Sequence, residues 1–414
     1  MESTIAQAPA RPTALRWIVL TLVFAAGTLN FADRQIIALL KPLLEKDLHW
    51  SDADYAGVVS AFQLATACTL IASGWFVDRV GLRAAYPLGV GTWSLAAMAH
   101  GLAGTLTQFT VARAGLGAAE TIGTPAAIKT IAAWFGDKER SLAMGIVNTA
   151  PNIGNIVGPL VLPALAVALG WRTAFIATGA AGFVWVLAWL ALGRRTGRAA
   201  EPVATVQGAR VPWLSLFADR RTWAIAGAKL LSDQAWWFLL FWAPDFFHRR
   251  FGLDLAHLGP PLALVYAMAG LGSFIGGFSV TRLMLAGVSL NAARKGVMLA
   301  AAIVVTPIVL APGAANYWIA AGILGLALAA HQAFATNIFA LSADIFPVSV
   351  VGSVIGIGGT AGTLGGMAIL QFAGWSLGHG QGYGMLFLIC AGAYIVALAW
   401  VQAMVPVIRS VHGE

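Results

Sequence analysis

Twelve long apolar runs, separated by short polar segments, decide what this chain can fold into. A helix that crosses a bilayer needs about 20 mostly apolar residues, because the hydrocarbon core is about 30 Å thick. The chain is 59% hydrophobic and only 10% charged, whereas soluble domains carry about 25% charged residues. We therefore predict an all-α polytopic membrane protein with twelve spans. Their expected limits are 16–40, 53–77, 83–104, 107–134, 140–168, 172–193, 222–247, 258–284, 291–311, 315–342, 349–374 and 382–406.

Positive charge is concentrated in alternate loops between these spans. With the N-terminus placed in the cytoplasm, the inner segments hold most of the Lys and Arg residues, among them Arg79, Arg83 and Arg140. Basic loops stay on the cytoplasmic side of a bilayer, so this bias predicts that both termini are cytoplasmic. The net charge of +8 is then a topology signal, and we expect no nucleic-acid partner. The expected location is the bacterial inner membrane, with the first run retained as a helix.

One segment differs in composition from the rest of the chain. Residues 194–221 are basic, include Pro202 and Pro212, and contain no apolar run. They predict a cytoplasmic linker between an N-terminal six-helix bundle, 1–193, and a C-terminal six-helix bundle, 222–414. Transporters built from two such pseudo-symmetric halves bind their cargo near the bilayer midplane, between the halves.

Four charged side chains interrupt the apolar runs. Asp33 and Arg34 lie in the first predicted span, and Arg113 and Glu120 lie seven residues apart in the fourth. A charge near the bilayer centre costs at least about 2.5 kcal/mol, so these residues should face a cavity or a partner helix. The spacing in the fourth span places both charges on one face, about 10 Å apart along the axis.

These charges suit coupled transport. Desolvation and a neighbouring arginine shift the proton affinity of a carboxylate in opposite directions, so Asp33 and Glu120 are the candidate proton-coupling residues. Arg34 and Arg113 each offer a planar fork that fits a substrate carboxylate. The alternative is a static buried ion pair that locks the bundle, with the arginines paired only to the two acids.

Further polar and aromatic residues within the spans are candidates for contacting a substrate. Each could instead form an inter-helix hydrogen bond or pack against its neighbours. This set consists of Gln63, Asn148, Asn152, Trp236, Trp237, Gln332, Asn337, Thr360 and Thr363. We expect His331 to be a packing residue, and Lys229 and Asp233, four residues apart, to neutralise each other.

The loop after the second span carries a Gly-x-x-x-Asp-Arg-x-Gly-x-Arg pattern, formed by Gly74, Asp78, Arg79, Gly81 and Arg83. Glycine permits close helix approach, and an acid beside clustered arginines can form a cytoplasmic charge latch. The alternative interpretation is that this segment is only a short basic turn. A weaker copy follows the eighth span, where Thr281 replaces the acid.

This loop resembles the signature of the major facilitator superfamily. Within the superfamily the chain is similar to the anion:cation symporter family, and there to the hexuronate transporters. The segments that carry the resemblance are 30–34, 59–65, 74–83, 113–120, 125–129, 134–140, 145–148, 152–154, 236–242, 331–332, 337, 342–347 and 356–359. The resemblance implies a twelve-helix fold with alternating access, and it adds Glu139 and Arg140 to the expected gating residues. Phe31 and Thr66 stand where the family carries tyrosines. Where relatives often carry Gly-Asn-Phe-Pro-Ala, this chain has Ile-Gly-Thr-Pro-Ala at 122–126 and so lacks an amide. The substrate is therefore less determined than the coupling machinery.

The combined expectation is proton-coupled symport of a sugar acid such as galacturonate or glucuronate by a monomer, with the proton as coupling ion and no other cofactor or metal. Enzyme signatures such as a P-loop or a zinc-ligand spacing are absent from the sequence, so we expect no enzyme activity. The first alternative is symport of another carboxylate (an aldonate, aldarate or aromatic acid). A second and weaker alternative is drug/proton antiport, which would not require Arg113. A non-transporting scaffold would not explain charges at the midplane.

Overall fold

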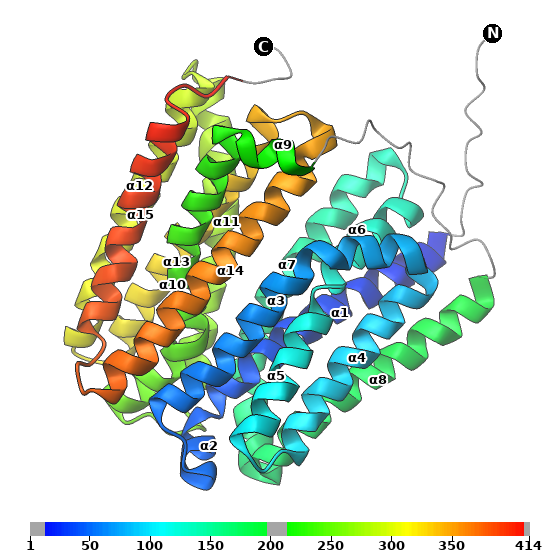
Figure 1. Ribbon diagram of the computed structural model, residues 1–414, viewed down its shortest axis with the longest axis vertical. Helices are drawn as coiled ribbons and strands as arrows, with labels where there is room; N and C mark the ends of the chain where they lie inside the picture. Colours follow the sequence, from blue (N-terminus) through cyan, green and yellow to red (C-terminus); the bar gives the residue numbers. More distant parts are fainter. Residues whose placement is uncertain (1–12, 197–212, 410–414) are drawn as a thin grey trace.

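The computed structural model describes residues 13–196 and 213–409, and within them the regular structure is entirely helical. Six helical rods form the N-terminal half and six the C-terminal half (Figure 1). The rods of the N-terminal half are α1 (Thr13–Leu39), α3 (Asp52–Val80), α4 (Leu82–Leu102), α5 (Leu106–Glu120) with α6 (Gly123–Trp134), α7 (Asp137–Leu169) and α8 (Trp171–Thr196). Those of the C-terminal half are α10 (Arg220–Phe251), α11 (Gly259–Leu285), α12 (Leu290–Val305) with η2 (Thr306–Gly313), α13 (Tyr317–Ile345), α14 (Val348–Gly378) and α15 (Gly384–Met404).

Two short helices, α2 (Lys41–Leu48) and α9 (Trp213–Ala218), connect rods. The twelve-span prediction is confirmed, and most limits agree to within a few residues. Eight of the described helices are individually long and apolar enough to cross a membrane, or nine if a bent α3 is one span. The other rods include α10, which carries buried Lys229, Asp233 and Asp245, and the interrupted α5–α6 pair.

The halves lie side by side, and both ends of the described chain are at the end of the molecule opposite α2 (Figure 1). Across the interface α3 packs against α14, α7 against α11 and α1 against α10. We call the two ends of the molecule the α2 end and the termini end. The domain limits remain a prediction, because 197–212, most of the expected linker, lies outside the described residues.

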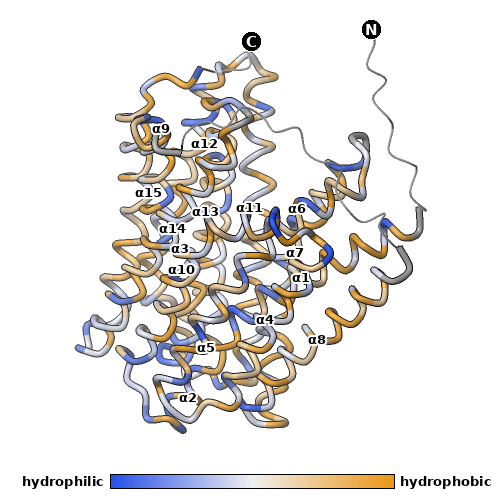
Figure 2. Tube along the Cα trace, turned by 45° about the vertical axis from the view of Figure 1, so that its right-hand side comes forward, coloured by the Kyte–Doolittle hydropathy of each residue, from blue (hydrophilic) through white to orange (hydrophobic). Residues whose placement is uncertain are grey.

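The outward faces of the rods are apolar. On α4, Leu88, Leu95 and Leu102 are 53%, 60% and 78% exposed, and their seven-residue spacing places them on one side of the helix. Figure 2 shows hydrophobic residues along every long rod and hydrophilic stretches at the two ends of the bundle. Such a belt is the surface that a lipid environment requires.

Two expected spans are interrupted by proline. Pro125 has no N–H to donate to the carbonyl of Thr121, four residues earlier, so α5 ends at Glu120 and α6 begins at Gly123. Pro307 likewise ends α12, and the Thr306 hydroxyl donates to the freed carbonyl of Ile303 at 2.7 Å. The first interruption matters most, because it places Glu120 at the end of a helix in the middle of a rod.

Glycine fixes the distance between α3 and α5 beside Glu120. A Cβ atom added at Gly117 would lie 2.5 Å from the backbone oxygen of Phe62, and Thr66 donates its hydroxyl to the Gly117 carbonyl at 3.2 Å. Gly117→Ala is therefore expected to lower the free energy of unfolding by about 1–3 kcal/mol, as overpacking does. Gly115→Ala on the same helix is the control, because its Cβ would meet only the Ala96 side chain at 3.8 Å. Thermal melting in detergent measures both, and equal melting temperatures would show that the contact does not constrain the helices.

Candidate functional site

Arg34 and Glu120 form a buried ion pair between α1 and α5. Arg34 Nε donates to Glu120 Oε2 at 2.6 Å. The Glu120 side chain is fully buried, whereas 14% of the Arg34 side chain remains accessible. The other carboxylate oxygen of Glu120, Oε1, has no hydrogen-bond partner among the described residues. The sequence left open which arginine pairs with which acid, and the arginine that pairs with Glu120 comes from the first span.

Arg113 has a different role. Its guanidinium donates from Nη1 to the backbone oxygen of Asp33 at 3.2 Å and from Nη2 to that of Arg34 at 2.6 Å. The side chain is completely buried. Arg113 therefore ties α5 to the backbone of α1 directly behind the ion pair.

Aromatic rings enclose both guanidinium groups. The Arg34 guanidinium lies 4.5 Å from the centroid of the Phe31 ring, and that of Arg113 lies 4.7 Å from Phe62 and 5.5 Å from Phe241. Phe241 belongs to α10, so the C-terminal half covers Arg113 on one side. Phe31, the position without the family tyrosine, contributes a ring face to Arg34 in place of a hydroxyl.

Asp33 is buried, and its Oδ1 has no hydrogen-bond partner among the described residues. It lies one residue from Arg34 but takes no part in the Arg34–Glu120 pair. The structure thus separates the two predicted coupling acids: Glu120 is paired with a cation, and Asp33 is not paired with any described cation.

The predicted polar residues divide into three groups. Gln63 and Thr360 are turned inward with side-chain atoms that have no partner among the described residues. Asn337 is tied to Arg294, at 3.1 Å, and to the backbone of Ala333 and Gly276, and Thr363 donates to the carbonyl of Gly359 at 2.9 Å.

The remaining predicted polar residues are more open. Asn152 is half-buried and faces Gly270 of α11, whose added Cβ would lie 3.6 Å from its amide. Gln332 is also half-buried, and Asn148 is exposed. Gln63, Asn152, Gln332 and Thr360 are therefore the better candidates for hydrogen bonds to a substrate.

The two tryptophans of α10 pack in different directions. Trp236 is half-buried and stacks on His331 with centroids 5.6 Å apart, while Trp237 is buried and stacks on Phe241 at 6.1 Å. His331 is hydrogen-bonded to the hydroxyl of Tyr394 at 2.7 Å, as expected of a packing histidine. The expected Lys229–Asp233 ion pair is present at 2.7 Å.

The fold is two six-rod halves, with a buried ion pair inside the N-terminal half. One family model, that of the Major Facilitator Superfamily, matches the chain over residues 23–369. The chain belongs to the major facilitator superfamily. Its relatives are transporters and not enzymes, so the expectation of a membrane transporter with this twelve-helix fold is confirmed.

Similar proteins come from several bacteria. The chain is 28% identical over 399 residues to the hexuronate transporter of Escherichia coli (strain K12), covering 91% of each chain. It is 28% identical over 280 residues to the galacturonate transporter of Dickeya chrysanthemi, covering 64% of this chain and 81% of that one. With the D-galactonate transporter of Escherichia coli O6:H1 it shares 26% identity over 418 residues.

Among solved structures, a bacterial homolog of the human lysosomal transporter Spinster, in an inward-facing and unoccupied conformation, matches with a TM-score of 0.70. It covers 96% of both chains at 20% sequence identity, so it supports the fold alone.

The predicted gating residues lie at the termini end of this superfamily fold. Asp78 forms an ion pair with Lys129 of α6, and Arg16 of α1 contacts Glu139 of α7 at 2.5 Å. Arg79 and Arg83 are exposed, and Arg140 is half-buried. Each of the two pairs joins elements of the N-terminal half, and the partner of Asp78 is a lysine rather than the clustered arginines that we expected.

The two glycines of the loop differ. Gly81 has φ +80°, a left-handed conformation that L side chains rarely adopt, so glycine is required at the turn between α3 and α4. A Cβ at Gly74 would meet no described atom within 4 Å. The expectation that Gly74 permits close helix approach is therefore wrong in this conformation. The second copy of the loop has no acid of its own at the position of Asp78. After it, Arg294 of α12 forms an ion pair with Asp344 of α13 at 2.6 Å.

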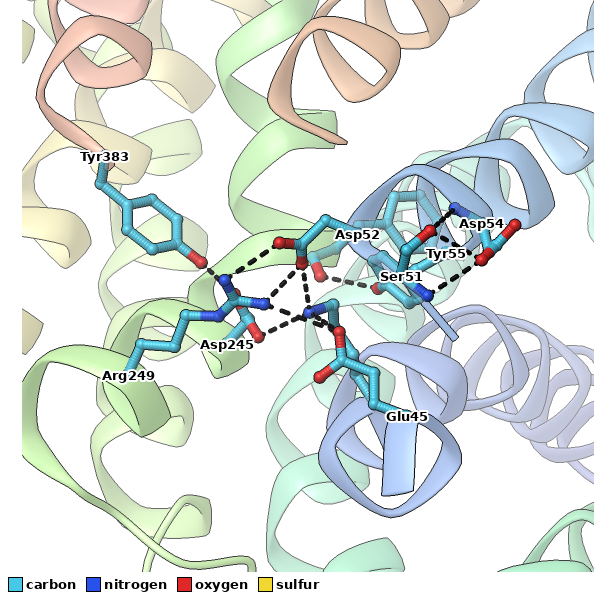
Figure 3. Close-up of polar contacts among 10 residues, drawn as sticks. Glu45, Ser51, Asp52, Asp54, Tyr55, Asp245, Arg249 and Tyr383 are labelled. Carbon is cyan, nitrogen blue, oxygen red and sulfur yellow. Dashed lines mark hydrogen bonds and ion pairs between the residues drawn. The ribbon is translucent and has the colours of Figure 1, made fainter. Parts of the chain in front are cut away.

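A cluster of charges at the α2 end was not among the predicted site residues (Figure 3). The α2-end cluster consists of Lys41, Glu45, Asp52, Asp245, Arg249 and Tyr383. Burial is the largest influence on Glu45 and raises the pKa of its carboxyl, although Lys41 opposes the shift. The signal was present in the sequence as charged residues close to the ends of the first, second and seventh runs.

Sequence reasoning also missed Gln35 and Asn155. Both are fully buried, and neither amide has a hydrogen-bond partner among the described residues. The Gln35 Oε1 atom lies 2.8 Å from where a Cβ on Gly158 would be, so it projects from α1 towards α7. Uncharged polar residues within an apolar run were the available signal.

Proposed function

We propose that the protein is a proton-coupled symporter of a monovalent sugar acid, a hexuronate such as galacturonate or glucuronate. It works by alternating access in the bacterial inner membrane, with both termini in the cytoplasm and the α2 end outside. The names of the similar proteins, two for hexuronates and one for an aldonate, support this cargo class.

The observation that carries the proposal is the Arg34–Glu120 pair. A substrate carboxylate that approaches the accessible edge of Arg34 competes with Glu120 for the same guanidinium. A carboxylate that loses its cation in a buried site is strongly destabilised unless it binds a proton. Substrate and proton therefore bind together, and the net charge of the site stays unchanged.

Arg113 acts as a positioning residue in this mechanism, because it is completely buried and its Nη1 and Nη2 atoms donate to two backbone oxygens of α1. It holds the segment that carries Asp33 and Arg34. Asp33, buried beside Arg34 with an unpartnered oxygen, is the second proton-binding group. Gln63 of one half and Gln332 and Thr360 of the other supply contacts to hydroxyl groups, and Trp236 offers a ring face.

Two other cargo classes compete with hexuronates. The loss of hydroxyls at Phe31 and Thr66 favours a less hydroxylated or aromatic acid, whereas the similarity to a D-galactonate transporter favours an aldonate. A drug/proton antiporter would bind its cation at Glu120, but Arg34 already occupies that carboxylate. The ion pair therefore favours an anionic cargo.

Uptake into proteoliposomes tests the proposal. With the inside buffered at neutral pH and the outside made acidic, galacturonate should accumulate above its external concentration. An uncoupler should abolish the accumulation, because proton entry supplies the driving force. Galactonate, galactarate and benzoate are assayed in parallel. Accumulation of one of these without galacturonate would replace the hexuronate with that acid, and uptake that is indifferent to the proton gradient would contradict symport.

A further inference from the structure

Three buried polar side chains lie where α1 and α7 of the N-terminal half meet α11 of the C-terminal half. Gln35 belongs to α1, Asn155 to α7 and Tyr266 to α11, and their relative exposures are 0%, 0% and 1%. Both polar atoms of each amide and the Tyr266 hydroxyl have no hydrogen-bond partner among the described residues. We call these three residues the amide–tyrosine cluster.

Glycines on α7 bring α1 and α7 into close contact at this point. A Cβ atom at Gly154 would lie 2.5 Å from the backbone oxygen of Thr28, and one at Gly158 would lie 2.8 Å from Gln35 Oε1. The Gln35 side chain therefore points from α1 to α7. It also faces the Tyr266 hydroxyl, although the two groups do not reach hydrogen-bond geometry.

Asn155 lies in the wedge between α1 and α11. Asn152 faces Gly270 of α11, and a Cβ atom at Gly259 of α11 would lie 2.7 Å from the backbone oxygen of Pro159. These two contacts follow α7 and α11 in opposite directions, so Asn155 and the tyrosine, which stand between them, are at about the same level. At about 100° per residue, Asn155 points between the side of α7 that meets α1 and the side that meets α11.

The cluster continues a row of amides along α7. Asn148, Asn152 and Asn155 are spaced by four and three residues, so they share one side of the helix. They are exposed, half-buried and fully buried in turn towards the α2 end. Trp236 of α10, which is half-buried, has its ring centroid 6.5 Å from that of Tyr266. The row therefore leads from the accessible part of the interior to the cluster.

The chemistry of the cluster suits hydroxyl groups. An amide offers donors and an acceptor, and a phenol hydroxyl offers one donor and accepts as well, so each can pair with a group that both donates and accepts. Gln35 directly follows Arg34 on α1, so the cluster adjoins the cation that we propose for the substrate carboxylate. The rings of Phe31 and Phe62 surround that cation and offer hydroxyl groups no acceptor oxygen or nitrogen.

We propose that Gln35, Asn155 and Tyr266 form a hydroxyl-binding subsite, which selects polyhydroxylated acids over acids of similar size without hydroxyl groups. This subsite rests on the proposed transport of a sugar acid. The three groups are buried in this conformation, so they bind the hydroxyls of the cargo when α7 and α11 part during alternating access. A site built to bind substrate hydroxyls rejects analogues that lack them, because its polar groups would then stay unpaired.

Near-isosteric variants of the full-length protein test the subsite in proteoliposomes. Gln35→Met, Asn155→Leu and Tyr266→Phe should each raise the half-saturating concentration of galacturonate by about 2- to 10-fold, the effect of one neutral hydrogen bond. Cyclohexanecarboxylate carries its carboxylate on a six-membered ring without hydroxyls. It should inhibit uptake at the same concentration in the variants as in the wild type.

Thermal melting without substrate separates binding from a structural role. Each variant should melt at the wild-type temperature or above it, because the substitution removes a buried polar group that has no partner. Ser376→Ala is the control, since Ser376 is also fully buried and unpartnered among the described residues but lies on α14. It should leave the half-saturating concentration of galacturonate unchanged.

Galacturonate uptake with the wild-type half-saturating concentration in all three variants overturns the subsite and leaves the proposed function in place. A lower melting temperature with equal losses of galacturonate and cyclohexanecarboxylate binding also overturns it. Wild-type uptake of galactonate without galacturonate replaces the hexuronate, and the three variants should then weaken galactonate in the same way. Preference of the wild type for cyclohexanecarboxylate over every sugar acid rejects both cargo and subsite. Should an amide variant fail to fold, Tyr266→Phe removes a single oxygen and gives the same test.

Discussion

Glu120→Gln should abolish uphill accumulation of the substrate while preserving its binding. Glutamine cannot take up or release a proton, so the accumulation ratio in proteoliposomes without a membrane potential should fall to about one. Because glutamine is also a weaker partner for Arg34 than a carboxylate, the substrate no longer has to displace a charged competitor. We therefore expect the concentration for half-maximal counterflow to stay the same or to decrease.

The measurements are gradient-driven uptake and counterflow on the same liposomes, over a range of pH. Counterflow by the variant should lose the pH dependence that Glu120 confers. Asp254→Asn is the control, because Asp254 is an exposed acid that pairs with His257 in a loop. Uphill accumulation by Glu120→Gln at the wild-type level would remove Glu120 from the coupling mechanism, and would leave Asp33 as the remaining candidate.

Arg34→Gln should weaken substrate binding, in contrast to Glu120→Gln, which should preserve it. It removes the only predicted substrate cation whose side chain is partly accessible, since Arg113 is fully buried. Loss of one partner from a buried charged pair costs about 2–5 kcal/mol, which corresponds to at least about a 30-fold rise in the half-saturating concentration. Arg34→Lys keeps the charge but not the planar fork, so it should recover part of the affinity.

Arg113→Lys separates positioning from substrate contact. Lysine can reach one backbone oxygen of α1 but cannot bridge those of both Asp33 and Arg34. We expect a lower melting temperature and slower turnover, with a half-saturating concentration changed far less than in Arg34→Gln. If Arg113→Lys weakens substrate binding more than Arg34→Gln does, the two arginines have been assigned in the wrong order.

Much of the fold could be predicted because hydropathy and charge are local properties. A spanning helix must satisfy its own backbone hydrogen bonds and bury its length in lipid. The ends of each helix can therefore be predicted from its own apolar run. The interruption at Pro125 follows from the same local chemistry, although the expected spans did not include it. The four midplane charges were also visible, because each stands in an otherwise apolar run.

The pairing of those charges was not available from local patterns. Arg34 and Glu120 are 86 residues apart, and Lys41 and Asp245 are 204 residues apart. Helical spacing placed Arg113 and Glu120 on one face, but it could not show that Arg113 is bound to the backbone of α1. The same limit applies to Asn337. As a polar residue within an apolar run it was a candidate for contacting the substrate, but in the structure its side chain accepts a hydrogen bond from Arg294.

A twelve-span membrane protein with carboxylates and arginines in its interior follows from the amino-acid sequence alone, because lipid excludes such charges unless the fold accommodates them. The packing of the helices shows that Arg34 neutralises Glu120, that Arg113 is buried against the backbone of α1, and that charges near the helix ends meet across the two halves. Ion pairs depend on distances of a few ångströms between helices far apart in the chain, and those distances are set by how the rods pack.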